Sequence, residues 1–165
     1  MGLSIALLTI SDTRTLADDS SGDQLLRSLE AADHRLHERR LCPDDRYQIR
    51  SELSRWIADP AVDVVITSGG TGLTGRDGTP EAVAPLLDKT IEGFGELFRV
   101  LSFESIGTST LQSRCLAGVA NGTFVFVLPG SLDAVTTAWD RLIRAQLDAN
   151  TRPCNLAQLR ARLKE

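Results

Sequence analysis

The sequence predicts an α/β fold in which helices cover both faces of a mainly parallel sheet. Three short apolar runs carry this prediction, at Ile5–Ile10, Val62–Thr67 and Thr123–Leu128. Such runs are typical of strands buried on both faces, as the strands of parallel sheets are. Segments with helical spacing of apolar residues separate the runs, and strands that alternate with helices favour parallel pairing.

Two helices are predicted between the first run and the second. The first begins near Ser20, because Ser20 and Asp23 have the spacing of a capping box. The second follows the turn Pro43-Asp44-Asp45 and ends before Pro60. Between these helices, His34–Leu41 alternates weakly between apolar and polar residues and is expected to form an edge strand.

Further helices are predicted on either side of the third run. Thr79 is expected to cap a helix that starts with Pro80 and that Pro85 shortens. Another helix carries an apolar stripe, formed by Phe94, Leu97, Phe98 and Leu101. Ser131 is expected to cap the last helix, a long one with an apolar face from Val135 to Ile143.

The composition indicates a single globular domain over residues 1–165, with a loosely attached tail from about residue 155. Its 18 basic and 22 acidic residues give a net charge of −4, which argues against nucleic acid as a partner. No apolar run approaches the roughly 18 residues of a membrane span. Three widely spaced cysteines argue against a zinc site and for the reducing cytoplasm.

The ends of the three buried strands are where we expect a ligand, because ligands of open α/β sheets bind at the carboxyl ends of the strands. The first run ends in Ser11-Asp12, the second in Ser68–Gly72 and the third in Pro129–Ser131. In a parallel arrangement all three ends lie along one edge of the sheet.

Two of these ends are suited to anions. The glycines of Ser68–Gly72 allow backbone amides to converge on a phosphate, although a tight turn that needs positive φ explains them as well. Pro129–Ser131 precedes a helix whose first amides favour an anion, and an ordinary capped turn is the alternative. Neither sequence is a Walker loop or a dinucleotide-binding GxGxxG motif.

Three acids, Asp12, Asp44 and Asp77, are expected at the same edge. Carboxylates beside a phosphate site require a cation between them, and Mg²⁺ is commonly held by one or two carboxylates together with substrate phosphates. Helix capping by Asp44 and a turn at Asp77 are the structural alternatives.

Taken together, these segments resemble the molybdenum-cofactor biosynthesis proteins of the MoaB/Mog type. The resemblance runs from about Leu3 to about Asn155, and the C-terminal TRPCN points to the MoaB branch. The segments that carry it are LLTISDT, the Pro43-Asp44-Asp45 turn, VVITSGGTGLTGRDGTPEA, GFGELFR, ESIGTSTLQSR and VFVLPGS.

The resemblance implies a three-layer α/β/α sandwich with a mostly parallel central sheet, assembled into trimers or hexamers. It implies molybdopterin as the substrate. Active members of the family are adenylyltransferases, which transfer AMP from Mg·ATP to the molybdopterin phosphate and release pyrophosphate. A separate downstream protein then inserts molybdate or tungstate.

The resemblance also assigns residues. Asp44 and Asp77 match the two acids tied to activity and are expected to hold Mg²⁺, directly or through water. The positions that match substrate and phosphate binding are Asp12, Ser68, Gly69, Gly70, Thr71, Gly72, Ser113, Pro129, Gly130 and Ser131. Gly78 departs from many relatives, which have a branched residue there.

Two other functions stay open at this stage. Some members of the MoaB branch lack one or more of the acids and bind the pterin without adenylating it, so the alternative is a non-catalytic molybdopterin carrier. The retention of Asp12, Asp44 and Asp77 favours catalysis. The third reading is a nucleotide hydrolase of the kind found in CinA-type domains, which usually carry a second domain.

Overall fold

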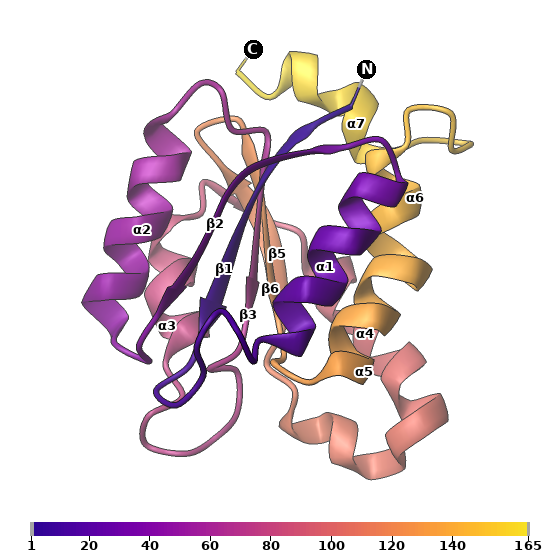
Figure 1. Cartoon of the computed structure of the whole chain (residues 1–165). Helices are drawn as coiled ribbons and strands as arrows, with labels where there is room; N and C mark the ends of the chain where they lie inside the picture. The colour runs from indigo at the N-terminus through magenta and orange to yellow at the C-terminus, as the bar shows by residue number, and fades with distance from the viewer. Residues whose placement is uncertain (1, 165) are drawn as a thin grey trace.

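A mixed sheet forms the middle of three layers in the computed structural model, which describes residues 2–164 (Figure 1). Within these residues the sheet has six strands in the order β2-β1-β3-β6-β5-β4. Their bounds are β1 (Ser4–Ile10), β2 (Arg35–Cys42), β3 (Val64–Ser68), β4 (Lys89–Thr90), β5 (Leu116–Ala120) and β6 (Thr123–Leu128).

The three predicted buried strands are confirmed, and they are neighbours. β1 pairs with β3 and β3 pairs with β6, both in parallel. In this register Thr9 lies opposite Ser68, and Ser68 lies opposite Leu128. The predicted edge strand is confirmed as β2, which runs parallel to β1. The ends of β1, β3 and β6 therefore share one edge, as expected.

Helices cover both faces of the sheet, as the sequence predicts. Figure 1 shows α2 and α3 on one side and α1, α4, α5 and α6 on the other. The helices are α1 (Ser20–Ala31), α2 (Arg46–Ala58), α3 (Thr79–Val83), α4 (Glu92–Ile106), α5 (Leu132–Ala138), α6 (Arg144–Leu147) and α7 (Leu156–Leu159). A π-helical turn over Trp139–Ile143 joins α5 to α6, so the predicted long helix is continuous.

Alternate residues of β1 supply the two cores. Ile5 and Leu7 belong to the cluster under α1, α4 and α5, whereas Leu8 belongs to the cluster under α2 and α3. The second cluster is built around Leu53 and Trp56, both fully buried. Burial on both faces is the physical reason why this strand is an uninterrupted apolar run.

Two of the predicted helix caps are wrong. Asp19, and not Ser20, caps α1, because the Asp19 carboxylate accepts a hydrogen bond from the Gly22 amide at 3.0 Å. Gly78 precedes α3 without a side-chain cap, and the Thr79 hydroxyl donates instead to the Gly69 carbonyl at 2.9 Å. In both cases tertiary contacts decide which polar atom is free to cap. The Ser131 cap is confirmed.

Strands β4 and β5 were not predicted. β5 runs antiparallel to β6, and β4 runs antiparallel to β5, so this edge of the sheet is mixed. The sequence of β5, LAGVA, is rich in small residues and contains Gly118. A Cβ on Gly118 would lie 2.6 Å from the Lys89 carbonyl oxygen, so β4 can approach only a glycine.

The apolar stripe of α4 is only partly in the core. Phe94 and Phe98 are buried and their rings pack against each other, with centroids 6.5 Å apart. Leu97 is 55% exposed, and Leu101 is half-buried. Part of the apolar stripe of α4 is therefore exposed on the surface of the single chain.

The C-terminal segment has defined contacts. Leu156 and Leu163 pack against the core under α1, and buried Asn155 caps α7 through the Gln158 amide. Arg160 forms an ion pair with Asp63 next to the first residues of β3. Among residues 2–164, no helix combines the length and apolar character needed to cross a membrane.

Replacing Leu53 by Ala should lower the free energy of unfolding by about 2–5 kcal/mol, because Leu53 is completely buried between α2 and the sheet. Urea unfolding followed by circular dichroism measures the change. Ser51→Ala is the matched control on the exposed face of α2 and should stay within about 0.5 kcal/mol of the parent chain. Similar losses in both variants would contradict this placement of α2.

Candidate functional site

Two loops meet at the edge where β1, β3 and β6 end. The Gly loop, residues 68–78, follows β3, and the turn Pro129–Ser131 follows β6. A Cβ on Gly130 would lie 3.2 Å from the Gly69 Cα, and a Cβ on Gly69 would lie 2.1 Å from the Ile10 carbonyl oxygen. The absence of side chains at Gly69 and Gly130 therefore lets the three strand ends come together.

The amides of the Gly loop do not all face a ligand. Gly69 donates its amide to the Leu128 carbonyl at 3.0 Å, and the Gly72 amide donates to the Asp77 carboxylate. Among residues 2–164, no hydrogen-bond acceptor is found for the amides of Gly70 and Thr71. The predicted anion nest thus narrows to these two amides, with Gly70 in the left-handed region at φ 67°.

Asp44 lies directly beside the Gly loop. A Cβ on Gly70 would be 2.9 Å and 3.0 Å from the two carboxylate oxygens of Asp44. The Oδ1 atom of Asp44 is buried and has no hydrogen-bond partner among the described residues. Burial raises the pKa of this carboxyl, the Gly78 amide opposes the rise, and the charges of Asp77 and Asp12 add to it.

Asp12, in the loop after β1, forms hydrogen bonds with Asp44 itself and with Arg76, the residue before Asp77. Its Oδ1 atom accepts the Asp44 amide at 3.0 Å. The Arg76 guanidinium donates to both of its oxygens, from Nε at 2.9 Å and from Nη2 at 2.8 Å. Chiefly through these hydrogen bonds, Arg76 lowers the pKa of Asp12 to about 2, so Asp12 is charged at neutral pH.

Asp77 holds the Gly loop in shape. Its Oδ2 atom accepts the Thr74 hydroxyl at 2.6 Å and the Thr74 amide at 2.9 Å. The Thr74 hydroxyl is the main reason why the pKa of Asp77 is lowered. On the other side of the loop, Arg114 donates to the Gly72 carbonyl at 2.9 Å, to the Asp77 carbonyl at 3.2 Å and to the Glu81 carboxylate.

Among residues 2–164, Ser113 forms no hydrogen bond to the Gly loop, and its Oγ atom is buried. Its amide closes a turn onto the Thr110 carbonyl, and its side chain lies beside the Cys115 thiol. The neighbouring Arg114 is what connects this segment to the Gly loop. Burial raises the pKa of Cys115, as is typical of an inert core cysteine.

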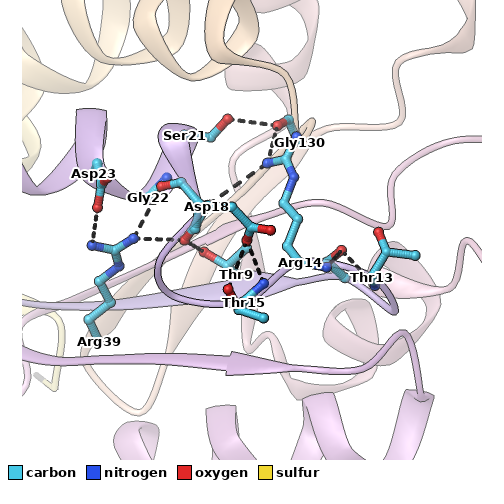
Figure 2. A network of polar contacts seen from close by, with 12 residues as sticks. Thr9, Thr13, Arg14, Thr15, Asp18, Ser21, Gly22, Asp23, Arg39 and Gly130 are labelled. Carbon is cyan, nitrogen blue, oxygen red and sulfur yellow. Dashed lines mark hydrogen bonds and ion pairs between the residues drawn. The ribbon is translucent and has the colours of Figure 1, made fainter.

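A network of polar contacts lies beside the turn after β6, and Figure 2 shows Arg39, Thr9, Ser21 and Gly130 as members of it. The Asp19 carboxylate is inaccessible to solvent and accepts the Thr9 hydroxyl at 2.6 Å and the Arg39 guanidinium at 2.9 Å. From the same helix start, the Ser21 hydroxyl donates to the Gly130 carbonyl at 2.8 Å. The network thereby joins β1, β2 and α1 to the turn after β6.

Arg14 adds a positive charge on this side of the edge. Its Nη1 atom lies 3.3 Å from the Gly130 carbonyl oxygen and 3.9 Å from the Asp19 carboxylate (Figure 2). The Ser11 hydroxyl accepts the Thr13 and Arg14 amides and so turns the loop in this direction.

The acids suit a magnesium ion only together with a ligand. Among residues 2–164, no three His, Cys, Asp or Glu side chains gather closely enough to hold a metal by themselves. The buried, unpartnered Oδ1 atom of Asp44 faces the space left by the missing side chain of Gly70. A hard oxygen donor in this position fits Mg²⁺, which takes few protein ligands and completes its shell with phosphates and water.

A cavity of about 790 Å³ lies elsewhere, at the opposite end of the sheet, where its lining includes His34, Asn121, Arg144 and Lys164. The candidate site is formed by the loops at the rim where β1, β3 and β6 end.

The structure brings together most of the predicted site residues. Asp12, Asp44, Asp77, the Gly loop and Pro129–Ser131 meet at one edge, and Ser113 is joined to them through its neighbour. The analysis of the sequence missed Arg14, Arg76 and Arg114 because it searched for acids and glycines. Arg76 precedes Asp77 and Arg14 lies two residues after Asp12, so a search for cations near the predicted acids finds these two, whereas Arg114 is marked only by its place beside Ser113.

The geometry defines a class of protein: an α/β domain whose parallel strand ends bring carboxylates and free backbone amides together at one edge of the sheet. A family model described as "Probable molybdopterin binding domain" matches residues 6–149. The chain is 54% identical over 151 residues to Molybdenum cofactor biosynthesis protein B of Escherichia coli, covering 92% of this chain and 89% of that protein. The Staphylococcus aureus protein of the same name is 43% identical over 146 residues, which cover 87% of this chain and 86% of that protein.

Solved structures agree with these relatives. A crystal structure of Molybdenum cofactor biosynthesis protein B superposes with a TM-score of 0.86 at 42% identity, covering 89% of this chain and 92% of that one. The tungsten cofactor synthesizing protein MoaB from Pyrococcus furiosus gives 0.78 at 34% identity, covering 86% and 91%. The chain belongs to the MoaB family of molybdenum cofactor biosynthesis.

Replacing Asp19 by Asn should lower the free energy of unfolding by about 1.5–3 kcal/mol at neutral pH, because it removes a buried charge that accepts hydrogen bonds from Thr9 and Arg39, while Arg39 keeps its ion pair with Asp23. Burial opposes the charge of Asp19, but hydrogen bonds from Thr9, Gly22 and Arg39 outweigh it and lower the pKa of the folded state below 3.8. The stabilisation is therefore complete above pH 3.8 and is lost as the pH falls through the folded pKa.

Urea unfolding of both proteins between pH 7 and pH 2 measures this effect. The difference between the parent chain and Asp19→Asn should shrink in the acidic range. A difference that stays constant down to the lowest pH would contradict a charged Asp19 in the fold.

Proposed function

We propose that this chain is a molybdopterin adenylyltransferase, which uses Mg·ATP to adenylate the phosphate of molybdopterin. The observation that carries the proposal is the Asp44 carboxylate, whose buried Oδ1 atom has no partner and lies beside the free amides of Gly70 and Thr71. An unsatisfied buried oxygen is costly unless a ligand or ion completes it. The membership of the MoaB family supports the pterin as substrate.

The chemistry follows from charge and position. A phosphate oxygen of molybdopterin attacks the α-phosphorus of ATP, the new P–O bond forms, and the bond to the bridging oxygen of the β-phosphate breaks, so that pyrophosphate leaves. The nucleophile is already ionised, and the reaction needs no strong base. Positioning of the two phosphates and stabilisation of their charge supply most of the rate.

The residues of the site divide this work. The amides of Gly70 and Thr71, with the loops of Pro129–Ser131 on the other side, hold phosphate oxygens. Asp44 and Asp77 would hold Mg²⁺, directly or through water, and the bound ion would supply positive charge that offsets the charge of the phosphates. Because Asp77 also accepts hydrogen bonds from Thr74 and Gly72, it positions the loop as well.

Replacing Asp44 by Asn should reduce turnover by about 100-fold or more, because it removes the charge that holds the cation and keeps the shape of the side chain. Release of pyrophosphate from Mg·ATP in the presence of molybdopterin measures turnover, and quenching of pterin fluorescence measures binding, which should remain. Asp33→Asn is the matched control, because Asp33 is exposed at the other end of the sheet and Asn tolerates its φ of 59°.

The alternatives give different results in the same assay. A non-catalytic carrier binds the pterin but forms no AMP adduct in a single turnover with the parent chain. A nucleotide hydrolase of the CinA kind releases phosphate without the pterin. Full turnover in Asp44→Asn contradicts the role given to Asp44.

We also propose that the chain assembles into trimers or hexamers through α4. Leu97, Val100, Phe103 and Ile106 follow one another at intervals of three residues and are 47–62% exposed. Leu111, in the 3₁₀ turn after this helix, is 81% exposed. A concentration of exposed apolar side chains on one helix and the turn after it is typical of an interface between subunits.

Replacing Phe103 by Glu should shift the assembly towards the monomer, because the variant buries a charge in the proposed interface. Light scattering at micromolar concentration measures the mass of both proteins. Tyr47→Glu on α2, where Tyr47 is 72% exposed, is the matched control and should keep the assembly. A monomeric parent chain would contradict the proposal.

The product of the proposed reaction implies a partner and a compartment. Adenylyl-molybdopterin has to reach a separate protein that inserts molybdate or tungstate, and the relatives include proteins named for both metals. We expect this pathway in the cytoplasm, where Cys42, Cys115 and Cys154 stay reduced.

A further inference from the structure

Arg76 joins two loops of the site by a single side chain. It stands at the tip of the Gly loop, 64 residues from Asp12, and its guanidinium binds both oxygens of the Asp12 carboxylate. The Arg76 side chain is 64% exposed and that of Asp12 is 37% exposed. The pair therefore lies at the surface of the rim, and Asp12 accepts the backbone amide of Asp44 beside it.

The fold does not depend on this pair. Exposed ion pairs contribute only about 0–1 kcal/mol to stability. The Gly loop is already held by Arg114, which binds the Gly72 and Asp77 carbonyls, and by the hydrogen bonds between Asp77 and Thr74. Arg76 can therefore leave Asp12 while the loop keeps its shape.

The two glycines near Arg76, Gly75 and Gly78, have open space where a side chain would be. A Cβ on Gly75 would meet no atom within 4 Å, and one on Gly78 would meet only the Arg76 carbonyl oxygen at 3.8 Å. Arg114 contrasts with it, because Arg114 is less exposed and binds three groups. Arg76 is therefore the cation of the rim that can turn towards a ligand.

The negative charge of a polyphosphate ligand would compete with the Asp12 carboxylate for the Arg76 guanidinium. In the unliganded site, Asp12 is its carboxylate partner, and the charges of Asp44 and Asp45 also act on it. A polyphosphate brings several negative charges to the same rim. A guanidinium binds phosphate oxygens in the same two-pronged way as it binds a carboxylate.

We propose that Arg76 exchanges partners: it binds Asp12 in the unliganded protein and a phosphate group of the polyphosphate ligand in the loaded one. Arg76 is then a positioning residue for the phosphate chain of the nucleotide. The identity of that nucleotide rests on the proposed function, whereas the exchange requires only a polyphosphate. Asp12, once released, still accepts the Asp44 amide and keeps its place in the site.

The exchange makes opposite predictions for its two partners. Arg76→Gln should weaken the binding of inorganic tripolyphosphate about 10- to 100-fold, because it removes a charged donor. Asp12→Asn should strengthen the binding, because it frees Arg76 and removes a negative charge, while the new side-chain oxygen still accepts the Asp44 amide. A merely structural ion pair would instead weaken binding in both variants.

Isothermal titration calorimetry of the full chain, in EDTA and at low ionic strength, measures these affinities without a metal ion or turnover. Arg141→Gln is the matched control, because Arg141 forms an exposed ion pair with Glu104 on the helical layer and should leave the affinity unchanged. Thermal unfolding of each variant checks that the fold is intact.

Equal affinities in the parent chain and Arg76→Gln would overturn the exchange, as would weaker binding by Asp12→Asn or no binding by any variant. The result is separate from the proposed function. A chain that shows the two opposite shifts but does not adenylate molybdopterin keeps the exchange and loses the adenylyltransferase.

Discussion

The parallel register of β1, β3 and β6 is the constraint on which the site depends. Because Thr9, Ser68 and Leu128 lie side by side, the loops that follow them leave the sheet at one edge. The backbones can come this close only because Gly69 and Gly130 have no side chains. The network around Asp19 then ties the turn after β6 to the first helix (Figure 2).

The negative charges of three carboxylates at this edge of the sheet are a second constraint on the site. Burial raises the pKa of Asp44, and Asp77 and Asp12 lie close enough that their charges raise it further. The three carboxylates have different hydrogen-bond partners in the fold. Asp12 has an arginine, Asp77 has the Thr74 hydroxyl and amides, and Asp44 keeps a buried oxygen without a partner. In the proposed function, a phosphorylated ligand with its cation would complete the last of these.

Much of the fold could be predicted because burial on both faces leaves a strong pattern. The three central strands are continuous apolar runs in the sequence, and Pro60 and Pro85 indicated where two of the helices end. β5 escaped prediction because its small residues resemble a loop, and Gly118 is there to admit β4. The cap of α1 was assigned to Ser20 because local spacing does not show that Asp19 is held by Arg39 from a strand 20 residues away.

The sequence by itself determined the three central strands, most of the helices, the family and the segments that end at the site, since these depend on local patterns and on the order of motifs along the chain. Only the tertiary structure decided which atoms of those segments are available. It directs the Gly69 amide into the sheet and leaves Gly70 and Thr71 free. It also pairs Arg76 with Asp12, because hydrogen bonds between distant segments depend on distances that the linear order does not contain.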